Sequence, residues 1–195
     1  MLSDDAKTKI TRIQDELKWH VDSVRNDPSL TAEYKQRHIA RHYLDAKRAH
    51  AEVVEQDTHD RDARRRMLEQ DVLGTGVSGL DSGAAIVSRR DAGDRAAALQ
   101  DEREALALLR RADRSGDEPL ARAIAERALD EQWAEVGNAF IANRPTIAPR
   151  YEELWDHRAP TLHEQVMESW ATMLLVPDEV QGMSEYRMAE MLESA

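Results

Sequence analysis

The sequence predicts an all-α protein, and three observations favour that class. The chain of 195 residues contains only 8 glycines and 6 prolines, too few for a loop-rich β protein. Alanine, leucine, glutamate and arginine, all strong helix formers, are abundant. Apolar residues recur at steps of three and four, the spacing that places them on one helical face. We expect a long N-terminal antiparallel helical hairpin, a glycine-rich hinge and a C-terminal helical bundle.

The hairpin is predicted over residues 1–73. Ser3 or Asp4 caps a first helix, and Pro28 ends it, because the residue before a proline avoids the α region. Thr31 caps a second helix after a connection so short that the two helices should pack antiparallel. Both apolar stripes are narrow, as in a coiled-coil seam.

A glycine-rich hinge is predicted over residues 74–83, GTGVSGLDSG, which hold four of the 8 glycines. Its first part resembles a phosphate-binding loop but lacks the preceding strand and the Gly-Lys-Ser/Thr ending, so we reject that function. The second hairpin helix reaches the hinge through the strongly charged stretch 55–72. We expect this stretch to be an exposed rod that stands in solvent or meets a partner.

The bundle is predicted over residues 84–176. Two capping boxes begin helices there: Asp101 with Glu104, and Thr161 with Glu164. One helix is expected to carry Leu120 and to continue towards Ile141. Three of the four tryptophans lie between Trp133 and Trp170, which predicts that the main core is here.

An acidic, methionine-rich tail, residues 177–195, follows the bundle and can form one short amphipathic helix. It either docks back on the core or contacts another subunit. The candidate contact residues of the tail are Met183, Tyr186, Met188, Met191 and Leu192. A second candidate contact is the short basic cluster of Arg61, Arg64, Arg65 and Arg66, which acidic residues flank on both sides.

The net charge of −11 is unevenly distributed. Residues 101–195 carry 10 arginines, no lysine and 20 acidic residues. This acidity disfavours bulk nucleic-acid binding, which needs clustered positive charge, and favours an acidic face for a basic protein partner. An alternative of another class is a helical nucleic-acid-binding or regulatory module that uses the basic cluster.

The residues that could carry chemistry are few. The chain has no cysteine, which excludes disulfides, thiol catalysis and cysteinyl metal sites. His38 and His42 at i,i+4, with His20 on the opposing helix, leave the alternative of a metal-dependent enzyme. His50, on the apolar stripe, is interpreted as a polar residue that fixes the register of the hairpin. We expect no catalytic, cofactor or metal site.

The sequence also bears on location. No run of 18 apolar residues is present, and the N-terminus opens acidic rather than with the basic-then-apolar order of a signal peptide. We therefore expect a soluble protein that is intracellular where it is made and has no membrane span.

Two segments carry a resemblance to a known class of proteins. They are LTAEYKQRHIARHYLDAKRAHAEVVEQDTHDRDARRRMLEQDVLG (30–74) and ALLRRADRSGDEPLARAIAERA (107–128), about a third of the chain. In them the chain is similar to small helical proteins from the structural-gene regions of tailed phages that infect actinobacteria. The resemblance implies a non-enzymatic virion-structural or assembly role, as a head–tail connector or capsid-associated component, or alternatively as a scaffolding protein. Because the rod, the acidic second half and the tail look incomplete in a single copy, we also expect a homo-oligomer. The resemblance implies contacts with other virion proteins, synthesis in the host cytoplasm and a location in the virion or procapsid.

Overall fold

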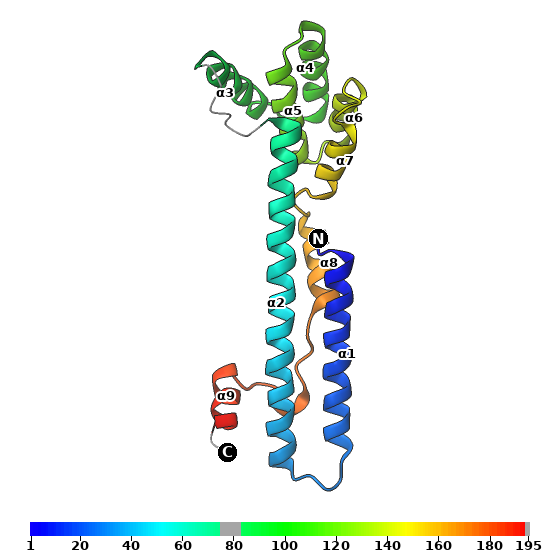
Figure 1. Ribbon diagram of the computed structural model, residues 1–195, viewed down its shortest axis with the longest axis vertical. Coiled ribbons are helices and arrows are strands. Elements are labelled where there is room, and N and C mark those ends of the chain that lie inside the picture. Colours follow the sequence, from blue (N-terminus) through cyan, green and yellow to red (C-terminus); the bar gives the residue numbers. More distant parts are fainter. Residues whose placement is uncertain (75–82, 194–195) are drawn as a thin grey trace. The chain divides into compact units, whose positions relative to one another are not determined.

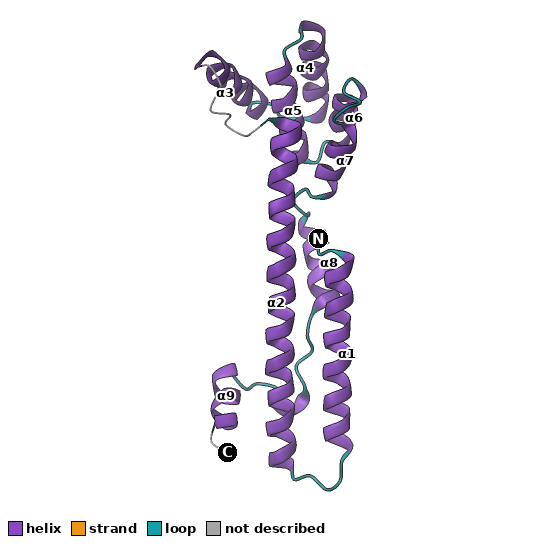
Figure 2. Ribbon diagram, in the orientation of Figure 1, coloured by secondary structure: helices purple, strands orange, loops and turns teal. Residues whose placement is uncertain are grey.

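A computed structural model describes residues 1–74 and 83–193 of the chain. Over those residues the protein is helical and contains no strand, so the predicted all-α class is confirmed (Figure 2). The helices labelled in Figure 1 are α1 (Asp4–Asn26), α2 (Ala32–Leu73), α3 (Gly83–Ala97), α4 (Glu102–Ser115), α5 (Glu118–Glu131), α6 (Ala134–Ala142), α7 (Ala148–Asp156), α8 (Leu162–Thr172) and α9 (Glu185–Glu193). A short 3-10 helix, η1 (Asp178–Val180), lies between α8 and α9 in the chain. Most of the predicted hinge, residues 75–82, lies outside the described part.

Two compact units share the chain. Unit 1 comprises Met1–Asp60 and Pro160–Ala195, and unit 2 comprises Arg61–Ala159. The division falls within α2 and at Pro160, whereas the sequence analysis placed its boundaries at 74–83 and 177. The difference has a physical reason: residues that follow Pro160 pack on α1, and the last turns of α2 contribute buried side chains to unit 2.

Unit 1 is built from α1, the first part of α2 and the C-terminal segment. The Ser3 hydroxyl caps α1 by accepting a hydrogen bond from the Ala6 amide at 3.2 Å, and α1 ends before Asp27-Pro28, as the sequence predicts. The Thr31 hydroxyl accepts from the Tyr34 amide at 3.2 Å at the start of α2, as expected. One buried cluster combines residues of α1 and α2 with two from the C-terminal segment: Leu17, Val21, Ile39, Ala40, Tyr43, Val180 and Met188. The C-terminal segment is therefore part of the core of unit 1.

Unit 2 is built around α5, which packs against α3, α4 and α6. Its buried face is rich in alanine: Leu120, Ala121, Ile124, Ala125, Ala128 and Leu129. Small side chains allow the neighbouring helices to approach closely. The last turns of α2 add Leu68, Val72 and Leu73 to the same core. The part of the predicted rod from Leu68 onward is therefore packed rather than bare.

Two details of unit 2 differ from the sequence-based expectation. The predicted helix from Leu120 towards Ile141 is interrupted at Gln132, which adopts the left-handed conformation with φ 59°, so that α6 is a separate helix. Helix α3 was not predicted individually, because its buried residues Ala92 and Ala96 are small and give a weak apolar pattern.

Candidate protein-contact surface

The most unusual surface of unit 1 is formed by apolar side chains of α8 and the segment that follows it. Helix α8 has no buried residue. Trp170 and Leu162 are both 77% exposed, and Leu175 is 73% exposed. We call the whole set the α8 surface: Leu162, Val166, Met167, Trp170, Met173, Leu175 and Val176. These seven are half of the large exposed apolar side chains among the described residues, so the surface is a concentrated patch.

The helix that carries this surface begins with a complete capping box, as the sequence predicts. The Thr161 hydroxyl accepts from the Glu164 amide at 3.1 Å, and the Glu164 carboxylate accepts from the Thr161 amide at 2.7 Å. The box begins the helix directly after Pro160 and places Leu162, Val166 and Trp170 four residues apart on one face.

The carboxylates of α8 make contacts within unit 1. Glu164 is used by the capping box. Glu168 accepts a hydrogen bond from the Leu2 amide and lies 4.0 Å from the N-terminal amino group. Of the exposed residues between the apolar ones, Gln165 and Ser169 are uncharged, and His163 is ionisable. The face of α8 that carries Leu162, Val166 and Trp170 therefore has no carboxylate, lysine or arginine, and its ionisable residue is His163.

Hydrogen bonds to backbone carbonyls hold the segment after α8 on α1 and α2. The Gln14 amide donates to the Met173 carbonyl at 3.1 Å, and His50 Nε2 lies 2.8 Å from the Thr172 carbonyl. The Gln36 amide donates to the Glu179 carbonyl at 2.8 Å. These bonds fix the backbone and leave the apolar side chains outside. His50 was expected to fix the register of the helices, and it contacts the C-terminal segment.

A groove runs between α1 and this segment, with a volume of about 610 Å³. Trp170, Met173 and Val176 line one side, and Leu17 and Val21 lie at its base on α1. Its walls are mostly apolar, and both positive and negative side chains of α1 lie along the rim. The groove extends the α8 surface onto α1.

The predicted basic cluster is largely neutralised within unit 2. Arg64 forms a two-pronged ion pair with Glu153, with both nitrogen–oxygen distances 2.6 Å. Arg65 donates to Glu69 at 2.7 Å and lies 3.9 Å from Asp130. The hydrogen bond between Arg64 and Glu153 raises the pKa of the arginine and lowers the pKa of the carboxyl. These arginines connect α2 to α5 and α7.

The other two arginines of the cluster are also placed within unit 2. Arg66 Nε donates to the Asp62 carbonyl one turn earlier at 3.1 Å, and Arg61 is half-buried. Contact of the cluster with a partner stays a prediction.

The predicted tail residues divide into two groups. Met188 is 2% exposed and belongs to the core of unit 1, while Met183 and Met191 are half-buried against it. Leu192 is also half-buried, and only Tyr186, at 77%, is largely exposed. In this structure the tail docks on its own unit, so four of its five candidate residues are partly or fully covered.

The histidines that could have held a metal ion stack instead. The rings of His20 and His42 are 4.0 Å apart and inclined by 9°, and His38 stacks on Tyr34, also at 4.0 Å. Ring-nitrogen lone pairs lie in the ring plane, so two parallel rings do not direct them at one ion about 2 Å from each nitrogen. No group of three or more metal-ligating side chains occurs in residues 1–74 and 83–193.

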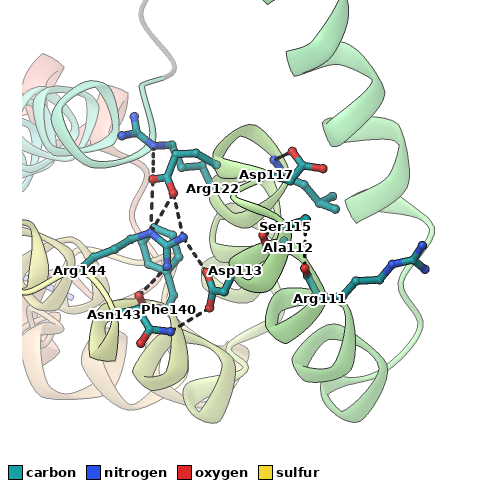
Figure 3. Close-up of polar contacts among 11 residues, drawn as sticks. Arg111, Ala112, Asp113, Ser115, Asp117, Arg122, Phe140, Asn143 and Arg144 are labelled. Carbon is teal, nitrogen blue, oxygen red and sulfur yellow. Dashed lines mark hydrogen bonds and ion pairs between the residues drawn. The ribbon is translucent and has the colours of Figure 1, made fainter.

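A network of ion pairs in unit 2 joins α4, α5 and the end of α6 (Figure 3). Arg144 is 13% exposed and donates to Asp113 and to Glu118, each at 2.8 Å. Its guanidinium also lies 4.3 Å from the centre of the Phe140 ring. Burial alone would raise the pKa of Glu118, but the hydrogen bonds from Arg144 and Arg122 outweigh it and lower that pKa. Every charge in the network has a partner, which indicates a structural role.

Comparison with protein-family models, with curated proteins and with solved structures finds no match to this chain. Among the described helices, none combines the length and the apolar character needed to span a membrane.

Sequence reasoning did not identify the α8 surface. It assigned Trp170 and the residues around it to the core, because an apolar stripe at helical spacing is normally buried within its own domain. The one available signal was the lack of carboxylates, lysines and arginines on this face, with Gln165 and Ser169 between the apolar residues. That signal does not distinguish a face buried in the chain from one buried against a partner.

Proposed function

We propose that this protein is a non-enzymatic structural or assembly protein that acts through protein–protein contacts and associates with copies of itself through the α8 surface. The observation that carries the proposal is the cluster of seven exposed apolar side chains there. Monomeric soluble proteins rarely expose a contiguous apolar patch of this kind, and a larger one marks an interaction site.

A second copy is the occupant that best fits the charge on this surface. In a two-fold pairing the same surface of the two copies meets, so a face dominated by one sign of charge would repel itself. The face that carries Leu162, Val166 and Trp170 has no carboxylate, lysine or arginine, its ionisable residue is His163, and Glu168 is paired with the N-terminus. Two copies of α8 can therefore meet without like-charge repulsion.

The size of the α8 surface also fits an interface between two copies. From their exposed fractions, the seven side chains leave an apolar area of the same order as the ~800 Å² that each partner contributes to a standard interface. The groove between α1 and residues 170–178 adds room for a side chain of the second copy. Large exposed aromatic residues such as Trp170 are typical of the centre of such interfaces.

The biological setting rests on the resemblance of segments 30–74 and 107–128 to actinobacteriophage structural proteins. It supports a head–tail connector or capsid-associated component located in the virion or procapsid, in contact with other virion proteins. A scaffolding protein for capsid assembly is the alternative within the same class. The N-terminal hairpin, hinge and C-terminal bundle expected from the sequence are part of this proposal.

Light scattering of the full-length protein on a sizing column tests the self-association. We expect the wild type to have a mass that is a multiple of the chain mass, and Leu162→Ser with Trp170→Ser to shift it to the monomer. Trp19→Ser is the matched control, because Trp19 is 65% exposed on α1 and lies outside the α8 surface. A wild type that stays monomeric at every concentration would contradict the proposal, and so would a multimer that the double substitution leaves unchanged.

A further inference from the structure

Unit 1 is assembled from two pieces of chain that lie far apart in the sequence. The first piece is the hairpin, residues 1–60, and the second is residues 160–193, which we call the C-terminal arm. All of unit 2, Arg61–Ala159, comes between these two pieces in the chain. The arm therefore binds the hairpin as a separate peptide would, through the contacts that it makes there.

The hairpin offers the end of the arm a site of matching charge and shape. Arg25 of α1 donates to both oxygens of the Glu179 carboxylate, at 2.7 and 2.9 Å, and Lys47 of α2 pairs with Glu185. The hydrogen bond from Arg25 lowers the pKa of Glu179. Val180, next to Glu179, is fully buried in the core that α1 and α2 form. The site thus recognises an acidic segment with apolar anchors, which is the character of the arm itself.

The beginning of the arm lacks such a site. None of residues 160–176 is buried, and burial begins at Pro177. Eight of these uncovered residues are large and apolar: Leu162, Val166, Met167, Trp170, Met173, Leu174, Leu175 and Val176. The end of the arm is therefore firmly docked, while its beginning, which carries the α8 surface, is left without a cover by the described part of the chain.

We propose that in the assembled protein the C-terminal arm is exchanged, so that the arm of each copy completes unit 1 of a second copy. The inference rests on the proposed self-association through the α8 surface. In a two-fold pair of α8 surfaces the two arms lie side by side, so each arm begins close to the hairpin of the other copy. Exchange retains the contacts of Arg25, Lys47 and Val180, because the partner's arm has the same sequence.

The connection between unit 2 and α8 suits an arm that extends to another copy. Residues 157–161 form no helix, and Ala159 precedes Pro160, so its backbone is biased towards an extended conformation. Short connections of this kind favour exchange between copies over a turn back within one chain. Exchange also adds the buried anchors Val180 and Met188 to the contact between copies, which then resembles a divided protein core, as obligate dimer interfaces do.

A short bismaleimide linker between two engineered cysteines tests which copy the arm binds, since the native chain contains no cysteine. Arg25→Cys with Glu179→Cys removes both partners of one ion pair, so no charge is left unpaired. Exchange predicts that the linker joins two chains and that a denaturing gel shows a covalent dimer. Asp45→Cys with Arg48→Cys is the matched control, because this ion pair lies within α2 and should be linked inside one chain.

Charge reversal gives a second test that needs no linker. Arg25→Glu and Glu179→Arg, made in separate chains, each place like charges at this contact and should lower the thermal midpoint. If the arms are exchanged, refolding the two variants together restores opposite charges at both contacts of a mixed pair. Mixed pairs should then exceed the share expected from random pairing, and the midpoint should recover most of its loss. With each arm on its own hairpin, the mixture would not recover.

Light scattering of the same samples separates this inference from the proposed self-association. A dimer in which the linker joins residues of one chain would overturn the exchange and leave the pairing of α8 surfaces standing. A mixture of the two charge variants that regains no stability would also overturn the exchange. A protein that stays monomeric at every concentration would overturn both proposals. The result we expect is a dimer that is covalently linked between its two chains.

Discussion

His20 of α1 and His42 of α2 stack face to face, with ring centres 4.0 Å apart and planes inclined by only 9°. This contact joins the two N-terminal helices through two imidazole rings. Burial, followed by the neighbouring charges of His20 and His38, lowers the pKa of His42, and Arg41 acts in the same direction while Asp45 opposes it. These surroundings therefore favour the neutral form of His42.

Acid should destabilise unit 1 through this pair. Because the pKa of His42 is lower in the folded state than its usual 6.5, the unfolded chain binds more protons as the pH falls through that value. Stability contributed by the neutral ring is present above pH 6.5 and is lost below it. We expect the urea midpoint to fall between pH 7.5 and 5, and to fall less in His42→Gln. His59→Gln, at an exposed position on α2, is the control and should retain the wild-type slope.

The network around Arg144 should be one of the most sensitive sites of unit 2. Arg144→Met leaves Asp113 and Glu118 without their shared partner and should cost about 3 kcal/mol of unfolding free energy. Arg48→Met removes an exposed ion pair with Asp45 and should change stability by less than about 0.5 kcal/mol. Chemical denaturation measures both, and equal small effects would contradict the structural role of the network.

Two glycine-to-alanine substitutions should change the stability of unit 2 in opposite directions. A Cβ at Gly137 would lie 3.1 Å from Cε1 and Oη of Tyr151, whose hydroxyl donates to the Ala125 carbonyl in the core. Gly137→Ala should therefore destabilise unit 2 by roughly 1–3 kcal/mol through overpacking. Gly93→Ala meets nothing within 4 Å in α3 and should stabilise by about 0.5–1 kcal/mol. Thermal unfolding of both variants checks the difference, and a shift of the same sign in both would be inconsistent with this packing.

The C-terminal tail should contribute to stability and not only to assembly. The sequence analysis leads to the expectation that deletion of residues 178–195 weakens assembly but leaves helicity nearly intact. Because Met188 is buried against α1 and α2, Met188→Ala should cost about 2–4 kcal/mol of unfolding free energy. Tyr186→Ala is the control, since that side chain is 77% exposed and should cost less than about 0.5 kcal/mol. A Met188→Ala protein as stable as the wild type would show that the tail is not part of the core.

The starts and ends of several helices were predictable, because their signals lie in a few neighbouring residues. Ser3, Thr31 and Thr161 cap helices as their positions indicate, and Pro28 follows the end of α1, because capping and proline geometry depend on a few neighbouring residues. The break at Gln132 was not predictable, since a left-handed glutamine has no strong sequence signature.

The candidate site depended on information that is not local. The pattern of Leu162, Val166 and Trp170 predicts an amphipathic helix, which α8 is, but not which surface covers it. In the same way, Met188 and Val180 gave no sign that they would complete a core begun by Leu17 and Ile39 about 140 to 170 residues earlier.

Self-association through the α8 surface is most directly tested by a single engineered cysteine, because the native chain contains none. Ser169 lies between the apolar residues of α8 and is exposed, and Ser23 on α1 is exposed outside that surface. In a two-fold pairing of α8 helices with the axis near Trp170, Ser169→Cys lies close to its own copy and should form a covalent dimer on mild oxidation. Ser23→Cys should remain a monomer under the same denaturing gel analysis. A Ser169→Cys protein that does not cross-link, or that cross-links no more than Ser23→Cys, would contradict the account.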